Sequence, residues 1–127
     1  MKNPSLQCFG ECQPIPCQWT ELGIRRYGFH GTSHQYCSQR AAELLGKPLE
    51  SLKMVICHLG NGASLSAVKG GKSIDTTMGF TPLEGLMMGT RSGTINPVIL
   101  IYLEREYQYN PDILKILLHK ESGLKEI

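Results

Sequence analysis

Three glycine-rich segments of this chain carry side chains that suit phosphate chemistry. In the first, Gly28 and Gly31 stand on either side of His30 just before a predicted helix, where free backbone N–H groups and the helix dipole favour an anion. His30 is therefore a candidate catalytic residue, although a histidine beside an apolar residue is more often a structural group. His34 lies four residues further on, but the glutamate of a His-Glu-x-x-His motif is missing, so no zinc site is expected there.

The second segment is a turn after a short apolar run, and it consists of His58, Leu59, Gly60, Asn61 and Gly62. Glycines at such a turn let backbone amides approach a phosphate closely, and the Asn61 side chain adds a further donor. An ordinary Asn-Gly hairpin turn has the same residues and is at least as common. The residues alone therefore leave both interpretations open.

The third segment, 89–93, holds Arg91 between two glycines. An arginine with such backbone freedom can present two N–H groups to carboxylate or phosphoryl oxygens, and Glu84 is the alternative partner for an ordinary salt bridge. Phosphoryl transfer needs positioned donors rather than strong nucleophiles. His30, Asn61 and Arg91 on glycine-rich turns meet that need.

Composition and charge exclude several classes of protein. The 127 residues are 41% hydrophobic and 19% charged, with a formal net charge of +2 and no long run of like charge. This pattern argues against nucleic acid or an anionic membrane as a partner. The longest apolar stretch, 98–103, is far shorter than the roughly 20 residues of a spanning helix, and no signal peptide is recognisable. We expect one domain at most, in the cytoplasm.

The five cysteines form an odd count and do not indicate a disulfide scaffold. Cys37 and Cys57 lie in periodic apolar segments, where small thiols are expected to be buried. Cys8, Cys12 and Cys17 could supply three zinc ligands, but they contain no Cys-x-x-Cys pair and no obvious fourth ligand follows. We expect three reduced thiols in an irregular lead, and no metal ligands in this chain.

Helical and strand periodicities outline the elements that must hold these segments. Thr32 and Gln35 form a capping box, which predicts a helix over 33–45 that ends at Gly46. Short apolar or alternating runs between glycine turns predict three consecutive antiparallel strands, at 53–59, 63–67 and 73–77.

The remaining stretches are a lead, a long loop and two helices. Residues 1–23 contain prolines and glycines that interrupt helices and strands, and their apolar residues show no periodic spacing. Residues 78–96 are predicted to form a long loop, and loops of this length are usually functional. Asn96 with Pro97 predicts a helix through Tyr107, and Asn110 with Pro111 predicts another that closes at Gly123.

Taken together, segments 26–34, 58–62 and 78–93 resemble the acetate kinase family, with the motifs in the same order. The resemblance implies reversible, ATP-dependent phosphorylation of acetate to acetyl phosphate. It also implies an α/β fold that is a partial actin-like (ribonuclease H-like) kinase fold, with antiparallel strand hairpins plus helices. Sugar kinases, heat-shock ATPases and actin share that two-lobed architecture. Residues 23–127 are then expected to span the lobe junction and the start of the second lobe, after an atypical lead at 1–22.

The same resemblance implies roles for individual residues. His30 and Arg91 match the residues that contact the phosphoryl group while it is being transferred. The turn matches the phosphate-binding segment for ATP, and Phe29 and Pro82 match residues that line a small pocket for the acetate methyl group. Acetate and ATP are the implied substrates, Mg²⁺ the implied metal and a homodimer the implied assembly. The family's magnesium ligands have no counterpart in this chain.

Two alternatives stay open. The absent metal ligands and the small part of a second lobe suit a noncatalytic remnant that binds phosphate or a nucleotide. Within the kinases, a propionate or butyrate kinase fragment would show the same motifs, because residues that set the acyl length lie partly outside this chain.

Overall fold

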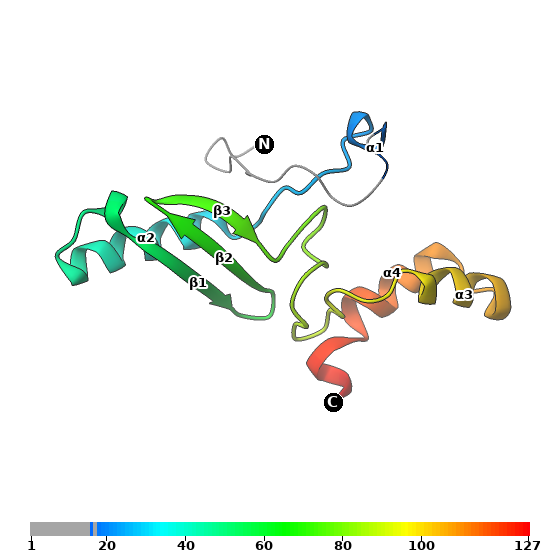
Figure 1. Cartoon of the computed structure of the whole chain (residues 1–127). Helices are drawn as coiled ribbons and strands as arrows, with labels where there is room; N and C mark the ends of the chain where they lie inside the picture. Colours follow the sequence, from blue (N-terminus) through cyan, green and yellow to red (C-terminus); the bar gives the residue numbers. More distant parts are fainter. Residues whose placement is uncertain (1–15, 17) are drawn as a thin grey trace.

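The computed structural model describes residue 16 and residues 18–127 of the chain. A three-stranded antiparallel sheet carries one long helix across it, and a loop then leads to two further helices (Figure 1). The elements in chain order are α1 (Gln18–Glu21), α2 (Gly31–Leu45), the 3-10 turn η1 (Leu49–Ser51), β1 (Lys53–Leu59), β2 (Ala63–Lys69), β3 (Lys72–Thr76), α3 (Val98–Tyr107), α4 (Pro111–Lys120) and the 3-10 turn η2 (Gly123–Glu126).

The three predicted antiparallel strands are confirmed. They pair in the order β1-β2-β3, with Leu59 opposite Ala63 across the first turn. β1 has the predicted bounds, whereas β2 runs two residues further, to Lys69. Gly70 and Gly71 turn the chain into β3 with φ values of 56° and 78°, a conformation that glycine adopts without the strain of a Cβ atom.

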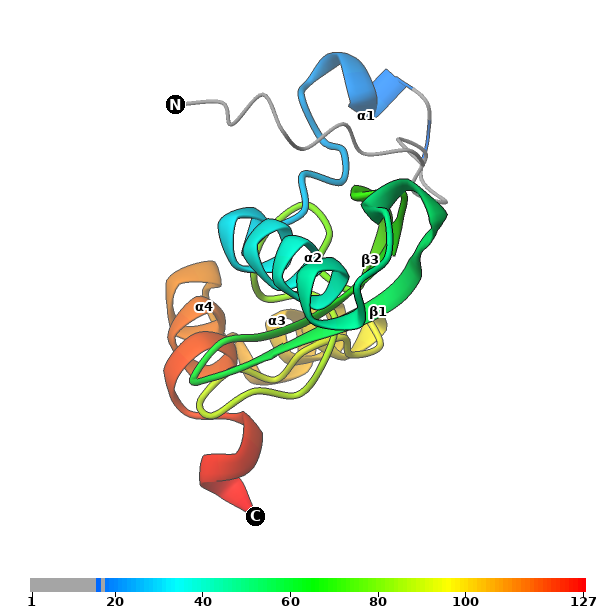
Figure 2. The same cartoon turned by 90° about the vertical axis from the view of Figure 1, so that its left-hand side faces the viewer.

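Helix α2 lies against one face of the sheet (Figure 2). It buries His34, Ser38 and Ala42, which recur every four residues and therefore share one side of the helix. The predicted start at residue 33, with Thr32 as the cap, is wrong. The helix begins two residues earlier because His30 is its N-cap: that residue has a left-handed φ of 60°, and its carbonyl accepts the His34 N–H at 3.0 Å.

The predicted long loop is confirmed, since residues 77–97 contain no helix or strand. The loop is nevertheless anchored. Met78 and Met88 are 0% and 1% exposed, form a core cluster with Ala63 of β2, and are packed by Phe29 and Leu86. The buried methionines hold both ends of the segment 78–88 beside the start of β2.

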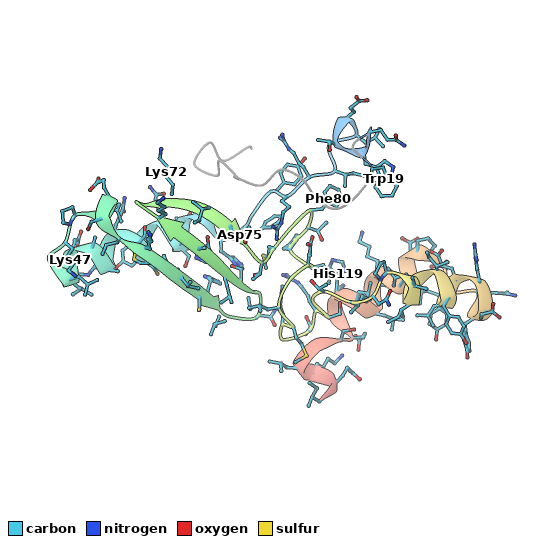
Figure 3. The ribbon with its side chains drawn as sticks, viewed as in Figure 1. Trp19, Lys47, Lys72, Asp75, Phe80 and His119 are labelled. Carbon is cyan, nitrogen blue, oxygen red and sulfur yellow. The ribbon has the colours of Figure 1, made fainter. Side chains whose placement is uncertain are left out.

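The last two helices stand apart from the sheet (Figures 1 and 3). Asn110 caps α4 as predicted, accepting the Ile113 N–H at 2.8 Å. The predicted end of this helix at Gly123 is wrong, because α4 ends at Lys120 and Gly123 begins η2. No residue of α3 is buried, and in α4 only Leu114 is.

Two predictions away from the glycine-rich segments are also wrong. The short helix α1 interrupts the stretch 1–23 that was expected to be irregular. Cys37 and Cys57 are exposed rather than buried, because their neighbours Ser38 and Ile56 take the inward positions of α2 and β1. In the described part of the chain, no helix is long and apolar enough to cross a membrane.

Candidate active site

Three histidines gather where the start of α2 meets the end of β1. The rings of His30 and His58 stack with centroids 3.9 Å apart and 20° between their planes. The ring of His34 meets them edge-on, at 6.4 Å from His30 and 6.5 Å from His58. The cluster forms because α2 crosses the face of the sheet with its first turn above the end of β1.

Serine hydroxyls fix the orientation of these rings. Ser64 Oγ of β2 lies 2.8 Å from His30 Nδ1 and 3.0 Å from His34 Nε2. Ser33 Oγ of α2 lies 2.9 Å from His58 Nδ1. Since the Nδ1 atoms of both stacked rings are occupied by hydroxyls, their Nε2 atoms are left to face the glycine turn 60–62.

The glycine turn forms the centre of the site. A Cβ atom at Gly62 would lie 3.2 Å from Arg91 Nη1 and 3.6 Å from His30 Nε2, and one at Gly60 would lie 3.8 Å from His58 Nε2. Because Gly62 has no Cβ atom, the arginine and the histidine can both approach its backbone closely. Two side-chain nitrogens from distant segments of the chain thus converge on this one backbone position.

Arg91 is brought there by the anchored loop. Its Nη1 donates to the carbonyl oxygen of Pro82 at 3.3 Å and lies 3.8 Å from Met88 Sδ. The loop also contacts the turn through its backbone, because the Gly89 N–H donates to Asn61 O at 3.2 Å. A Cβ atom at Gly89 would lie 2.5 Å from Asn61 Oδ1, so a larger residue there would push the Asn61 side chain aside.

A brace that sequence reasoning missed supports the arginine loop from the C-terminal side. Backbone N–H groups of η2 and the residue before it donate to carbonyls of the loop: Ser122 to Thr90 at 3.2 Å, Leu124 to Met88 at 2.9 Å and Lys125 to Gly89 at 3.0 Å. Gly123 permits this contact with a φ of 75°, and a Cβ atom there would lie 2.7 Å from Arg91 O. The sequence signal for this brace is Gly123 itself, which lies three residues past the end of α4.

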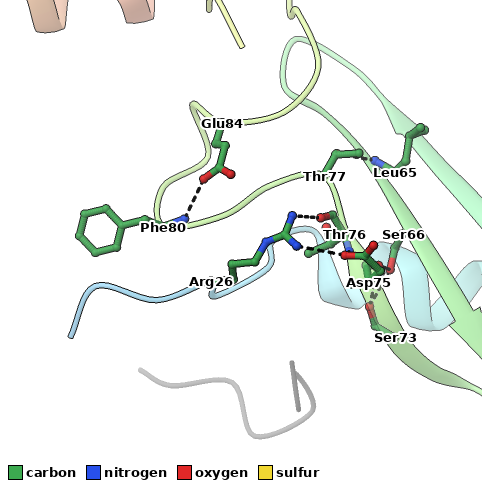
Figure 4. A network of polar contacts seen from close by, with 9 residues as sticks. All are labelled: Arg26, Leu65, Ser66, Ser73, Asp75, Thr76, Thr77, Phe80 and Glu84. Carbon is green, nitrogen blue, oxygen red and sulfur yellow. Dashed lines mark hydrogen bonds and ion pairs between the residues drawn. The ribbon is translucent and has the colours of Figure 1, made fainter. Parts of the chain in front are cut away.

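A second set of contacts holds the segment that leads into His30 (Figure 4). Arg26 Nη2 donates to the carbonyl oxygen of Thr76 at 2.7 Å, and its Nη1 pairs with Asp75 Oδ1 at 3.2 Å. The Tyr27 N–H donates to Gly79 O at 3.0 Å. The strand end and the loop thus fix the chain just before the histidine. Glu84, the alternative ion-pair partner of Arg91 in the sequence, accepts the Phe80 N–H at 3.3 Å.

The electrostatics of the cluster favour neutral rings for His30 and His34. Burial lowers the pKa of His30 below its ordinary value of 6.5, and the neighbouring His58 and Arg91 lower it further. Burial also lowers the pKa of His34, with His30 and His58 adding to the effect. At neutral pH the His30 ring therefore offers one N–H donor without a charge, while Arg91 supplies a fixed positive charge.

Other predicted site residues are placed less directly. Leu59 is 73% exposed, so it reaches the turn through its backbone rather than its side chain. Phe29 packs against the methionine core, and Pro82 contacts Arg91 through its carbonyl oxygen. Their pocket for an acyl methyl group stays a prediction. A pocket of about 450 Å³ lies elsewhere, on the sheet around Lys53, Lys69 and Ile74, and contains none of the candidate residues.

The donors around Gly62 do not suit magnesium. Mg²⁺ prefers carboxylate and other oxygen ligands, whereas the side chains converging here are imidazole and guanidinium nitrogens. Across residue 16 and residues 18–127, no three side chains of His, Cys, Asp or Glu are grouped so that they could hold a metal ion. The cysteines considered for zinc, Cys8, Cys12 and Cys17, lie outside the described residues.

Comparison with curated proteins finds relatives named acetate kinase. The chain is 91% identical to the acetate kinase of Microcystis aeruginosa over 114 residues, which cover 90% of this chain and 28% of that protein. It is 66% identical to the acetate kinase of Rippkaea orientalis over 114 residues, with the same coverage of 90% and 28%. The chain therefore spans about 28% of the length of these relatives.

Solved structures agree with the predicted fold. The acetate kinase of Porphyromonas gingivalis superposes with a TM-score of 0.85 at 44% identity, covering 89% of this chain and 29% of that one. A propionate kinase from Francisella tularensis gives a TM-score of 0.85 at 46% identity, covering 91% and 30%. The prediction of a partial actin-like α/β fold with antiparallel hairpins is thereby confirmed. The family model described as "Acetokinase family" matches residues 10–127, and the chain therefore belongs to the acetokinase family.

Proposed function

We propose that this chain supplies the phosphoryl-binding part of an ATP-dependent acetate kinase, which interconverts acetate and ATP with acetyl phosphate and ADP. The observation that carries the proposal is the convergence of His30 Nε2 and Arg91 Nη1 on Gly62. Membership of the acetokinase family and the likeness to acetate kinase structures support it. In this proposal residues 23–127 span the junction of two lobes and the start of the second.

The geometry suits a direct, in-line transfer. An acetate oxygen forms a bond to the γ-phosphorus of ATP while the bond from that phosphorus to the bridging oxygen breaks, and ADP leaves with the electron pair. His30 and Arg91 donate hydrogen bonds to the equatorial oxygens of the group in transit. They act as donors and not as nucleophiles, so no covalent enzyme intermediate forms.

The turn 60–62 would bind the phosphates of the nucleotide. Its glycines leave the backbone open to an anion, and Asn61 is exposed at the tip, where its amide can donate. The Nε2 atom of His58 lies beside Gly60 and adds a polar group at the same end. Because the turn also bonds to the arginine loop, a phosphate bound there is aligned with Arg91.

A noncatalytic phosphate- or nucleotide-binding role is the second candidate, because a glycine turn beside Arg91 suits a bound anion whether or not transfer follows. Both candidates are tested by mixing the purified 127-residue chain with acetate, ATP and magnesium, measuring acetyl phosphate and, by calorimetry, ATP binding. Turnover that His30→Ala abolishes supports the kinase. Binding that Gly62→Ala abolishes, without turnover, supports the binding role. Absence of both contradicts each function for this chain.

The acyl specificity forms a further part of the proposal, since a propionate kinase matches as well as an acetate kinase does. We assign the acyl group to the side of Phe29 and Pro82 and expect acetate to be preferred over propionate and butyrate, because the relatives at 91% and 66% identity are named acetate kinase. A hybrid enzyme tests this: the 114 matched residues of this chain replace their counterparts in the Microcystis aeruginosa acetate kinase. A higher kcat/KM for propionate or butyrate than for acetate would contradict the preference.

A further inference from the structure

Ser64 contacts both His30 and His34, of which only His30 contacts the phosphoryl group in the proposed reaction. The side chain of Ser64 is 0% exposed, near the start of β2 and beside the first turn of α2. Its oxygen lies 2.8 Å from His30 Nδ1 and 3.0 Å from His34 Nε2. His30 faces the glycine turn with its other nitrogen, whereas His34 is 5% exposed and lies behind the site.

We call the two hydrogen bonds from His34 through Ser64 to His30 the bridge. The number of hydrogens available to it limits which groups can donate and which accept. A serine hydroxyl has one hydrogen to donate, and each neutral imidazole has one N–H. If both rings donated to Ser64, its own hydrogen would have no ring to accept it. The arrangement that uses the Ser64 hydrogen within the bridge therefore has one ring donating to Ser64 Oγ and the other accepting from it.

The surroundings of His34 decide which ring donates. Its Nδ1 atom is buried, and no hydrogen-bond partner for it exists among the described residues. Placing the single proton of His34 on Nε2 uses that donor in the bond to Ser64. The opposite tautomer would place an N–H at the buried, unpartnered Nδ1, where an unmet donor is costly. His34 is therefore the donor, and Ser64 donates in turn to His30 Nδ1.

We propose that Ser64 and His34 are positioning residues that fix His30 as a neutral Nε2–H donor aimed at the phosphoryl group above Gly62. The role in turnover rests on the proposed kinase function, whereas the bridge itself does not. Protonation of His30 would require its Nδ1 to become a donor and would break the sequence of bonds. The other groups that face His30, namely His34, His58 and Arg91, bear either no charge or a positive one, so none stabilises the charged ring.

The bridge is tested by nitrogen-15 NMR of the imidazoles in the 127-residue chain. We expect His30 to carry its proton on Nε2, with an Nδ1 resonance shifted by an accepted hydrogen bond, and His34 to carry its proton on Nε2. In Ser64→Ala the His30 Nδ1 resonance should move toward that of an unbonded nitrogen and the pKa of His30 should rise. Ser64→Thr, which keeps a hydroxyl, should retain both properties.

Ser66→Ala is the matched control, because Ser66 is also buried in β2 but its hydroxyl contacts Ser73 Oγ at 2.7 Å. It should leave the His30 signals unchanged. A proton on His30 Nδ1 in the unmodified chain would overturn the proposal without any variant. So would a Ser64→Ala chain whose His30 resonance and pKa match those of the unmodified chain.

The role in turnover is measured in the hybrid enzyme. Ser64→Ala should lower kcat about tenfold, the scale of one positioned hydrogen bond, with little change in KM for ATP, and Ser64→Thr should recover most of it. An unchanged kcat in Ser64→Ala would overturn the positioning role. An inactive hybrid with Ser64 intact would contradict the kinase function alone, because the NMR result decides the bridge separately.

Discussion

The rings of His30 and His58 stack face to face at a centroid distance of 3.9 Å, although one belongs to the N-cap of α2 and the other to the end of β1. Two stacked imidazoles beside Arg91 oppose added positive charge. Burial, His58 and Arg91 lower the pKa of His30, so its ring stays neutral while the arginine carries the charge for binding an anion.

The first prediction concerns stability as a function of pH. The folded-state pKa values of His30 and His34 lie below the ordinary 6.5, so the unfolded chain binds more protons as the pH falls through that range. The histidines should contribute their whole share to the free energy of unfolding above pH 6.5. This contribution should decrease as the pH falls from 6.5 toward the lowered folded-state pKa values. Urea unfolding across this range measures it. His34→Gln should flatten the decrease; stability that rose on acidification would contradict the account.

The second prediction is that Arg91→Ala in the hybrid enzyme loses roughly 3 to 5 kcal/mol of transition-state stabilisation, or about 200- to 5,000-fold in kcat/KM. The reason is that Arg91 supplies the positive charge beside Gly62. Steady-state kinetics measures it, with Arg105→Ala on the exposed helix α3 as the matched control. A variant with near-normal turnover would remove Arg91 from the proposed mechanism.

The third prediction separates binding from folding at Gly62. Gly62→Ala adds a Cβ atom 3.2 Å from Arg91 Nη1 at a position without positive φ, so the fold should tolerate it within about 1 kcal/mol. The methyl group occupies the space assigned to the phosphoryl oxygens, and ATP affinity should fall at least roughly tenfold. Calorimetry and urea unfolding measure the two effects.

Gly46→Ala is the control for both measurements on Gly62→Ala, because Gly46 has a φ of 60° with nothing within 4 Å of its Cβ position. It should cost about 1 kcal/mol of stability and leave ATP affinity unchanged. If Gly62→Ala bound ATP as well as the unmodified chain does, the space at Gly62 would not be the phosphate site.

The fourth prediction tests the brace behind the arginine loop. In Gly123→Ala the new Cβ atom would collide with the carbonyls of Met88 and Arg91, at a φ of 75° that already disfavours alanine. We expect a loss of more than about 2 kcal/mol in stability and a fall in kcat of the hybrid enzyme, because the loop must move. A loss of stability equal to that of Gly46→Ala, with full activity, would show that the brace is dispensable.

The sheet could be predicted from sequence because its signals are local. Glycine turns and alternating residues fix the three strands, and Asn110 fixes the start of α4. The start of α2 could not be predicted in the same way, since the left-handed His30 replaces the usual side-chain cap. A residue's φ at a helix start depends on the contacts that hold the preceding segment, which a capping pattern does not contain.

The candidate site was predicted only in part. Residue type and glycine spacing pointed to His30, Asn61 and Arg91, but their convergence depends on the packing of Met78 and Met88, which no local pattern reveals. Ser64 was missed because an alternating strand suggests that its polar residues face solvent. In this sheet the serine side is the buried one, since α2 covers it with histidine and serine side chains.

The measurement that tests the central claim most directly is kcat of the hybrid enzyme with His30→Ala beside the unmodified hybrid and a His119→Ala control. The account predicts a loss of about 10²- to 10³-fold in His30→Ala, as expected when a donor to the transition state is removed, and normal turnover in the control. Equal turnover in all three would contradict the assignment of His30 to the phosphoryl group.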